Sequence, residues 1–348
     1  MAQPSPSRRP RILLVKLSSF GDVLHALPTL EALRDAYPDA HITWLVEAAY
    51  APLLSGHPAL NEVWVAPRLR PAEFWSGSNP AILHRLVQQL RARPFDLVVD
   101  VQGLLKSAVW VALARSPRKV GYDRTRELSY LALTERVDPF DPEAHAVQRY
   151  LNLAYYLGAP FTSPRFRLGL DAAVDISALI PGKADRPLAV LHPGARWSSK
   201  LWPLASWAHL AEWLRDQGFQ VAVTGSAADR ELATSLTAQC RAPLLNLAGS
   251  TSLAQLAGIL RKTRLAVTTD TGAMHLAASL GTKVTALFGP TAPWRTGPFG
   301  DGHQVVRLGL PCSPCFKRRC PDPRCLTDLT PEMVEAACEK ILSVRPNS

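Results

Sequence analysis

Nine short runs of mostly apolar residues are spread along this chain, and longer stretches with helical spacing of apolar positions separate them. Continuous apolar runs of this length are typical of strands that are buried on both faces, as in parallel sheets covered by helices. We therefore expect an α/β fold with parallel sheets. The runs span residues 11–16, 41–46, 62–66, 96–100, 188–193, 219–225, 243–249, 265–270 and 283–289.

A passage that contains several Pro and Gly residues divides these runs into two similar series. The pattern predicts two doubly wound, Rossmann-like domains that face each other, with ligands beyond the carboxyl ends of the strands. Helices are expected at 204–217 and 227–240. The predicted segments are a tail at 1–10, an N-terminal domain at 11–160, a linker at 161–187, a C-terminal domain at 188–330 and a terminal helical segment at 331–348.

Length and composition agree with this division. A chain of 348 residues, 47% of them apolar, can bury two cores. No apolar run approaches the roughly 18 residues of a membrane span. The opening MAQPSPSRRP is polar and Pro-rich, which indicates a disordered tail rather than a signal peptide, so we expect a cytoplasmic protein.

The formal net charge of +10 favours an anionic partner. The basic residues are scattered and form no nucleic-acid motif, so we expect no nucleic acid. A phosphorylated small molecule or an anionic membrane surface accounts for the charge at least as well.

The turn after the run at 265–270 is the clearest candidate for a phosphate site. Asp270 or Thr271 can cap the following helix, Gly272 permits close approach to the backbone, and His275 lies one turn further on. Free amides at a helix N-terminus suit a phosphate. The alternative is a capped core helix with a surface histidine.

Two further strand ends offer polar groups. Ser198, Ser199 and Lys200 lie in a loop where the lysine suits a diphosphate, although an isolated lysine is more often a solvated surface residue. Asp229 and Glu231 follow another strand, where a carboxylate either accepts ribose hydroxyls or supplies negative charge to a helix N-terminus. Neither the G-x-G-x-x-G fingerprint nor a Walker A sequence is present.

The first strand is followed by Ser18, Ser19, Gly21 and then Asp22, at the start of an amphipathic helix. A carboxylate in that position is suited either to capping the helix or to acting as a general base. The residues alone leave both roles open.

Together, four motifs resemble the lipopolysaccharide heptosyltransferases of glycosyltransferase family nine. They are VKLSSFGDVLHALP, VQGLLKSA, SSKLWP and DTGAMHLAASLG with LFGPTAPWRTGP, in this order between residues 11 and 298. The first motif is most similar to heptosyltransferase I, which acts on the Kdo of the inner core. The HPGARW loop is more similar to that of heptosyltransferase II, so an acceptor that already bears a core heptose is the alternative.

The resemblance implies a GT-B fold and inverting transfer from ADP-L-glycero-D-manno-heptose to Kdo-lipid A, with no cofactor and no metal. It implies that the enzyme acts at the cytoplasmic face of the inner membrane, in peripheral contact with anionic lipid. It further implies a general base at Asp22, a diphosphate contact at Lys200 and a terminal helix that braces the N-terminal domain. Implied donor contacts are Lys200, Ser199, Glu231, Asp270, Thr271, Gly272 and His275; implied acceptor contacts are Ser18, Ser19, Arg68, Lys106 and Arg126.

One segment departs from the family pattern. Cys312, Cys315, Cys320 and Cys325 lie within CSPCFKRRCPDPRCL. Zinc-binding sequences usually separate two cysteine pairs by a longer loop, so we favour a packed or redox-labile loop over a metal site. Its basic residues could instead touch an anionic membrane.

Two other functions remain open from the sequence. A nucleotide-sugar epimerase of the same fold needs several acid/base groups around the sugar, and Asp22 is the one good candidate. A non-enzymatic nucleotide- or lipid-binding scaffold would keep the 270–275 helix but would not need Asp22.

Overall fold

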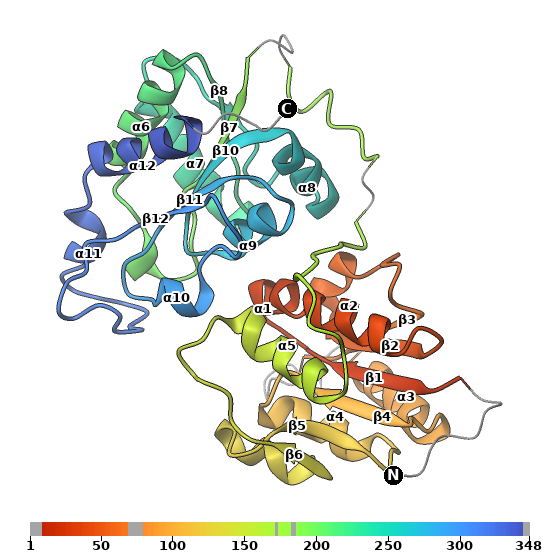
Figure 1. The fold of residues 1–348 in the computed structure, drawn as a ribbon. Helices are drawn as coiled ribbons and strands as arrows, with labels where there is room; N and C mark the ends of the chain where they lie inside the picture. Colours follow the sequence, from red (N-terminus) through yellow and green to blue (C-terminus); the bar gives the residue numbers. More distant parts are fainter. Residues whose placement is uncertain (1–8, 69–78, 171–172, 182–185, 344–348) are drawn as a thin grey trace. The chain divides into compact units, whose positions relative to one another are not determined.

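A computed structural model describes residues 9–68, 79–170, 173–181 and 186–343 of the chain. It divides into two compact units, Met1–Leu170 and Asp171–Ser348. Each unit contains its own six-stranded sheet with helices packed on it (Figure 1). All strand pairs within both sheets are parallel. The α/β class expected from the apolar runs is confirmed.

The first unit has the strand order β3-β2-β1-β4-β5-β6. Its central strands are buried along nearly their whole length, because helices cover both faces of the sheet. The strands are β1 Arg11–Val15, β2 His41–Glu47, β3 Glu62–Ala66, β4 Leu97–Asp100, β5 Lys119–Tyr122 and β6 Glu135–Val137. The helices are α1 Phe20–His25, α2 Leu27–Ala36, η1 Ala48–Leu53, α3 Asn79–Ala92, α4 Leu105–Leu113, η2 Arg126–Ala132 and α5 Ala146–Tyr156.

The second unit has the strand order β12-β11-β10-β7-β8-β9. The strands are β7 Leu188–His192, β8 Gln220–Val223, β9 Leu245–Asn246, β10 Thr263–Thr269, β11 Val284–Leu287 and β12 Gln304–Val306. The helices are η3 Ser198–Lys200, α6 Leu204–Asp216, η4 Ala227–Asp229, α7 Arg230–Ala238, α8 Leu253–Lys262, α9 Gly272–Ser279, α10 Pro293–Thr296, α11 Arg324–Thr327 and α12 Pro331–Ser343.

Numbered from its own first strand, each sheet has the order 3-2-1-4-5-6, which is the doubly wound arrangement. The chain reverses its direction of winding between β1 and β4 in the first unit, and between β7 and β10 in the second. Loops that follow these strands diverge there and leave room for a ligand. The turns to inspect are therefore those that begin at residues 16, 101, 193 and 270.

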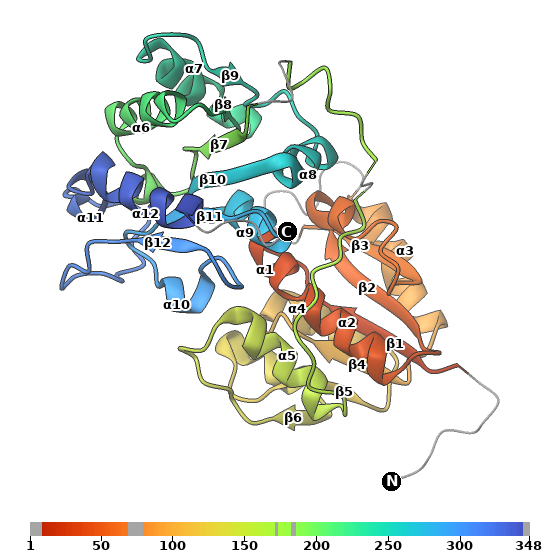
Figure 2. The ribbon, with the colours of Figure 1, turned by 45° about the horizontal axis from the view of Figure 1, so that its top comes forward.

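Alternate residues of each strand contribute to different layers. In the first unit, Leu13 and Val15 of β1 pack with apolar residues of α3 and α4, such as Leu90 and Trp110. In the second unit, one layer joins the sheet to α6, α7 and α12. Helices α8 and α9 are not part of that layer, and both pack against β10 (Figure 2).

The sequence pattern missed three strands: β5 and the two edge strands β6 and β12. These strands are only three or four residues long, so their apolar content does not stand out. The run at 243–249 was too long a prediction, because only Leu245 and Asn246 pair as strand β9. The helix expected at 227–240 begins as a 3-10 turn and becomes α-helical at Arg230.

The predicted linker is divided between the two units. Arg165 and Arg167 form ion pairs with Asp35 and Glu31 of α2, so the first part of this segment belongs to the first unit. Ile176 is buried and lies against Gly258 of α8, so the later part belongs to the second unit. Residues in both parts of the predicted linker therefore pack within one unit or the other.

Helix α12 packs in the second unit. Its buried residues Val334, Ala337, Cys338 and Ile341 belong to the core of that unit, where they pack with α6 and β12. The contact with the N-terminal domain that the resemblance implies for this helix stays a prediction. Among the helices that the structure describes, none has both the length and the apolar composition to cross a bilayer.

Candidate functional site

Asp22 lies in the first turn of α1, directly beyond the carboxyl end of β1. Its Oδ2 accepts hydrogen bonds from the backbone N–H (3.1 Å) and hydroxyl (2.8 Å) of Ser19. This is the capping arrangement that the sequence allowed. Capping uses only one of the two carboxylate oxygens, so the other oxygen can make further interactions.

The second oxygen of Asp22 belongs to a buried network that the sequence analysis missed. Tyr150 of α5 donates to Asp22 Oδ1 at 2.9 Å, and Lys16 Nζ donates to the Tyr150 hydroxyl at 2.8 Å. The Lys16 ammonium also lies 4.3 Å from the centre of the Tyr150 ring. Lys16 is only 2% exposed. The signal available in the sequence was a lysine within an apolar run, since a buried lysine needs a partner.

Burial by itself would raise the pKa of the Asp22 carboxyl. The charges of Lys16 and His25 and the two Ser19 hydrogen bonds together outweigh burial, and they hold that pKa well below its ordinary value. Burial lowers the pKa of Lys16, and the charges of Asp22 and Asp100 only partly offset this effect. The pair is thus a buried cation beside a carboxylate that stays ionised.

Asp100, at the end of β4, is the other carboxylate at this edge of the sheet. It accepts hydrogen bonds from the backbone of Gln102 (3.0 Å) and Gly103 (3.1 Å) and from the Ser107 hydroxyl (3.1 Å). Burial nevertheless raises the pKa of Asp100 to about 6. Asp100 therefore organises the turn between β4 and α4, while Asp22 remains the partly exposed group of the two.

Three of the predicted acceptor residues gather around a carboxylate that was not predicted. Lys106 contacts the hydroxyl of Ser18 and lies 2.9 Å from Glu47, at the end of β2. Arg68 lies 3.8 Å from the other oxygen of Glu47. The position of Glu47 at a strand end was the signal that sequence reasoning passed over. Arg126 does not join this group, since it lies in η2 with an exposed side chain.

In the second unit, Lys200 and Asp270 meet at the reversal point of the sheet. Lys200 Nζ lies 2.6 Å from Asp270 Oδ2 and 3.2 Å from the Asp270 carbonyl oxygen. Thr291, from the turn after β11, donates to the same carboxylate oxygen at 2.6 Å. The lysine also lies 4.5 Å from the centre of the Trp197 ring. Asp270 therefore positions the ammonium of Lys200.

Helix α9 begins directly after Asp270. Thr271 is its N-cap residue, but its side chain does not cap the helix, and its buried hydroxyl has no hydrogen-bond partner among the described residues. Gly272 opens the helix, and His275 lies one turn in. The first-turn amides and the Thr271 hydroxyl are thus available to an anion beside Lys200.

Ser199 lies differently from the donor contact that the resemblance implies. It is 2% exposed, and its hydroxyl donates to the Lys317 carbonyl at 2.7 Å. Its backbone N–H donates to the Arg318 carbonyl at 3.4 Å, and the Arg318 guanidinium lies 5.7 Å from the centre of the Trp197 ring. The structure thus uses Ser199 to anchor the Lys200 loop to the cysteine-containing segment.

The two carboxylates after β8, those of Asp229 and Glu231, have different surroundings. Asp229 accepts from the backbone N–H (2.7 Å) and hydroxyl (2.6 Å) of Ser226, and it fills the space beside Gly194, where a Cβ would lie 2.4 Å from it. Glu231 is exposed in the first turn of α7. Asp229 is therefore a local structural group, whereas Glu231 is open to a ligand.

The four clustered cysteines are free thiols, with Cys312 exposed and the others partly buried. Burial raises the pKa of Cys325, and the neighbouring thiols of Cys315, Cys312 and Cys320 add to that shift. Within the described ranges, no three His, Cys, Asp or Glu side chains are grouped so that they could hold a metal ion.

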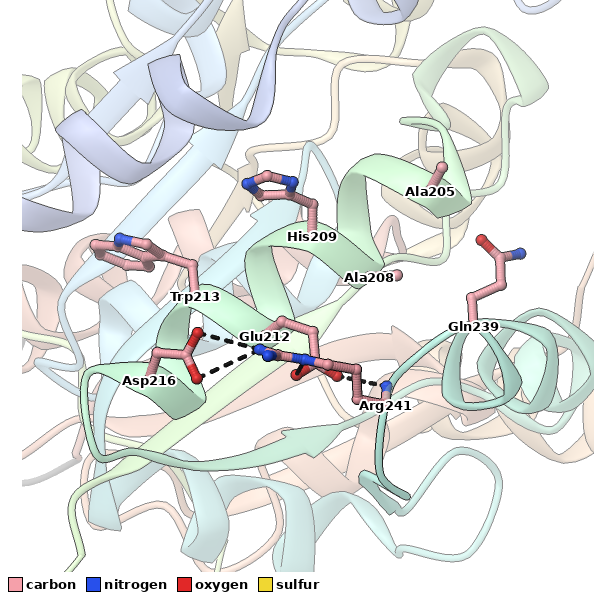
Figure 3. A pocket seen from close by; sticks show the side chains of 8 residues that line it. All are labelled: Ala205, Ala208, His209, Glu212, Trp213, Asp216, Gln239 and Arg241. Carbon is pink, nitrogen blue, oxygen red and sulfur yellow. Dashed lines mark hydrogen bonds and ion pairs between the residues drawn. The ribbon is translucent and has the colours of Figure 1, made fainter.

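A separate pocket of about 600 Å³ lies between α6 and the end of α7. Figure 3 shows the guanidinium of Arg241 between the carboxylates of Glu212 and Asp216, at 2.8 and 3.1 Å. These charges satisfy one another. The pocket is formed by helix surfaces rather than strand ends, so it is not the candidate site.

A comparison with protein families matches residues 83–325 to glycosyltransferase family 9 (heptosyltransferase). The chain belongs to this family. It is therefore a glycosyltransferase, as the four motifs predicted.

Individual family 9 relatives cover nearly the whole chain. Lipopolysaccharide heptosyltransferase 1 of Pseudomonas aeruginosa is 35% identical, over 95% of this chain and 98% of that protein. Lipopolysaccharide heptosyltransferase 2 of Escherichia coli K12 is 31% identical, over 86% of this chain and 88% of that protein. The structure of E. coli heptosyltransferase WaaC with ADP-2-deoxy-2-fluoro heptose has a TM-score of 0.73 at 29% identity, over 95% and 99% of the two chains.

The family 9 assignment and the two sheets agree. Structural neighbours among heptosyltransferases share the GT-B fold expected here. The family match includes the Lys200 and Asp270 region as well as Tyr150, and it begins after Asp22.

Proposed function

We propose that this family 9 enzyme transfers L-glycero-D-manno-heptose from ADP-heptose to the Kdo of the lipopolysaccharide inner core, with inversion at the anomeric carbon. The observation that carries the proposal is the state of Asp22. It is a partly exposed carboxylate at the reversal point of its sheet, and Lys16 and Tyr150 hold it ionised and oriented.

The donor half of the proposal rests on the second unit. Lys200, placed by Asp270, and the free N-terminal amides of α9 suit a diphosphate. Thr271 offers an unused hydroxyl, His275 lies one turn further along α9, and Glu231 is available for ribose. These groups would stabilise the negative charge that develops on ADP as the glycosidic bond breaks.

The acceptor half rests on the first unit. The acceptor hydroxyl loses its proton to Asp22 while its oxygen forms the new bond to the anomeric carbon, and the bond to ADP breaks on the opposite face. A carboxylate with a lowered pKa is a weak base, so proton transfer is late, when bond formation has acidified the oxygen. Arg68, Lys106 and Arg126, with Ser18 and Ser19, are the proposed contacts for the anionic acceptor.

The proposal also includes where the enzyme acts. We place it at the cytoplasmic face of the inner membrane, in peripheral contact with anionic lipid, because the acceptor is a lipid and the chain carries a net charge of +10. Turnover is expected without an added cofactor or divalent ion, since Lys200 and the α9 amides supply the positive charge.

The test is a transfer assay with ADP-heptose and two acceptors, Kdo-lipid A and Kdo-lipid A that already bears one heptose. We expect transfer to the first acceptor, without loss in EDTA, and a product with inverted anomeric configuration. Transfer to the second acceptor alone would instead assign a heptosyltransferase II activity, which the 31% identity to that relative makes the second candidate. Interconversion of the sugar nucleotide without transfer would indicate an epimerase.

A further inference from the structure

Four large apolar side chains are exposed on neighbouring elements of the first unit. Leu105 and Val109 of α4 are 57% and 41% exposed, and Leu128 and Leu131 of η2 are 60% and 64% exposed. Leu105 and Val109 are four residues apart, so they lie on one face of α4. Leu128 and Leu131 both belong to η2, whose backbone is kinked at Glu127 and Leu128. We call these four residues the α4–η2 patch.

The two halves of this patch are directly joined. Helix α4 packs against η2, and the backbone N–H of Leu105 donates to the Glu127 carboxylate at 3.0 Å. Glu127, the residue before Leu128, therefore accepts a hydrogen bond from the first residue of α4. The four exposed side chains are thus carried by two elements that contact each other directly.

The backbone of η2 is held in a conformation that keeps the leucines outward. Glu127 and Leu128 have φ values of 61° and 56°, and Arg124 just before them has 49°. Left-handed backbone is disfavoured for residues with a Cβ, and most strongly for bulky ones. Burial of Leu128 does not offset the cost of this backbone conformation, since its side chain stays 60% exposed.

Positive charge surrounds the patch. Arg124 and Arg126 have exposed side chains at its edge, and among the described residues no carboxylate lies within ion-pair distance of Arg126. Arg136 lies 5.1 Å from the centre of the ring of Tyr130, another residue of η2. The acidic residues there are already engaged: Asp123 with Arg124 and Arg136, and Glu127 with the α4 backbone.

Exposed leucines bordered by arginines suit the interfacial region of an anionic bilayer, where apolar side chains enter the acyl boundary and cations stay among the headgroups. We infer that the α4–η2 patch is the surface through which this enzyme docks on an anionic membrane. The inference deepens the proposed function and rests on it, because a lipid acceptor is presented at such a surface. Lys106, one residue after Leu105, connects the patch to the Ser18 and Glu47 group.

The test measures binding to vesicles without any transfer reaction. The variant combines Leu128→Asn, which suits left-handed backbone, with Leu131→Gln. The matched control is Met333→Gln on α12, another exposed apolar residue, at 40%. We expect the wild type and the control to co-sediment with phosphatidylethanolamine–phosphatidylglycerol vesicles, and the double variant to bind about tenfold more weakly. Binding of the wild type should fall with added salt and be weak on phosphatidylcholine vesicles.

A second readout separates docking from catalysis. The double variant should transfer heptose at the wild-type rate to an acceptor stripped of its acyl chains, and more slowly to the same acceptor embedded in vesicles. Equal vesicle binding by variant and wild type would overturn the inference. So would a wild type that ignores vesicles but forms a dimer that the variant loses, since the patch would then join two copies. Absence of transfer to either acceptor would contradict the proposed function while leaving the vesicle result to stand alone.

Discussion

Tyr150 donates a 2.9 Å hydrogen bond to Asp22 from a position 128 residues further along the chain. The same hydroxyl accepts a hydrogen bond from Lys16, so it connects a buried cation to the carboxylate without direct contact between the two charges. This arrangement lets Asp22 keep its charge in a site where burial alone would favour its protonated form.

Asp22→Asn should abolish most of the transfer. The amide can still accept the Ser19 hydrogen bonds but cannot take a proton, so we expect turnover to fall by about 10²- to 10⁴-fold with ADP-heptose affinity retained. The checks are a transfer assay, a donor titration and a thermal melt on one preparation. Some loss of melting temperature is expected, because Lys16 loses a charged partner; wild-type turnover would exclude Asp22 as the base.

The pH dependence of the wild type follows from the lowered pKa of Asp22. A carboxyl whose pKa is depressed in the folded state stays ionised above its unfolded value and is protonated only below it. We therefore expect no loss of the catalytic carboxylate between about pH 5 and 7. A steep acid limb in turnover near pH 6 that Asp22→Asn removes would contradict this.

Tyr150→Phe should affect the reaction without touching the substrate. It removes the hydroxyl between Lys16 and Asp22, which should cost about 1–3 kcal/mol of unfolding free energy and lower the rate of transfer. Because Tyr150 acts through Asp22, the acid limb of turnover should shift in the variant while donor affinity stays unchanged. Tyr122→Phe, which removes another buried tyrosine hydroxyl of this unit, is the control and should leave that limb in place.

Lys200→Ala should weaken donor use by about ten- to a hundredfold. A charge-assisted contact to phosphate is worth about 1.5–3 kcal/mol, and the loss should appear in ADP-heptose affinity and turnover rather than in acceptor affinity. Lys262→Ala, at an exposed end of α8, is the control for general loss of charge. Unchanged donor affinity in Lys200→Ala would mean that the ion pair with Asp270 is purely structural.

Ser199→Ala should loosen the Lys200 loop. The change removes the hydrogen bond to the Lys317 carbonyl, at a cost of about 0.5–1.5 kcal/mol. We expect the KM for ADP-heptose to rise while the KM for the acceptor stays constant. Ser198→Ala removes only a 3.4 Å contact from the same loop and should behave as wild type. Equal donor kinetics in both variants would assign Ser199 no positioning role.

Asp100→Asn should change how stability depends on pH. The folded pKa of about 6 lies above the ordinary value near 4, so the contribution of Asp100 is fully present below about pH 4 and is lost as the pH rises through 6. Asparagine does not titrate. Calorimetric melts between pH 4 and 7 should show a difference between wild type and variant that changes across this window; a constant difference would show that Asp100 has an ordinary pKa.

Much of the fold could be read from the chain. Runs such as 62–66 and 188–193 are apolar enough to be strands buried on both faces, and their spacing requires helices between parallel neighbours. The family was also predictable, because four motifs in a fixed order resemble it. The packing of helix α12 could not be predicted: its apolar face is evident locally, but the core that receives this face depends on long-range packing.

The sequence by itself determined the two sheets, the strand ends that carry polar groups and the family. Only the tertiary structure decided which of those groups meet. Lys16 and Tyr150 reach Asp22 because α5 packs against α1 and α2. Glu47 lies near Lys106 and Arg68 because the ends of parallel strands meet at one edge of the sheet. The reason is physical: apolar periodicity acts over a few residues, whereas a buried charge finds its partners across the whole folded chain.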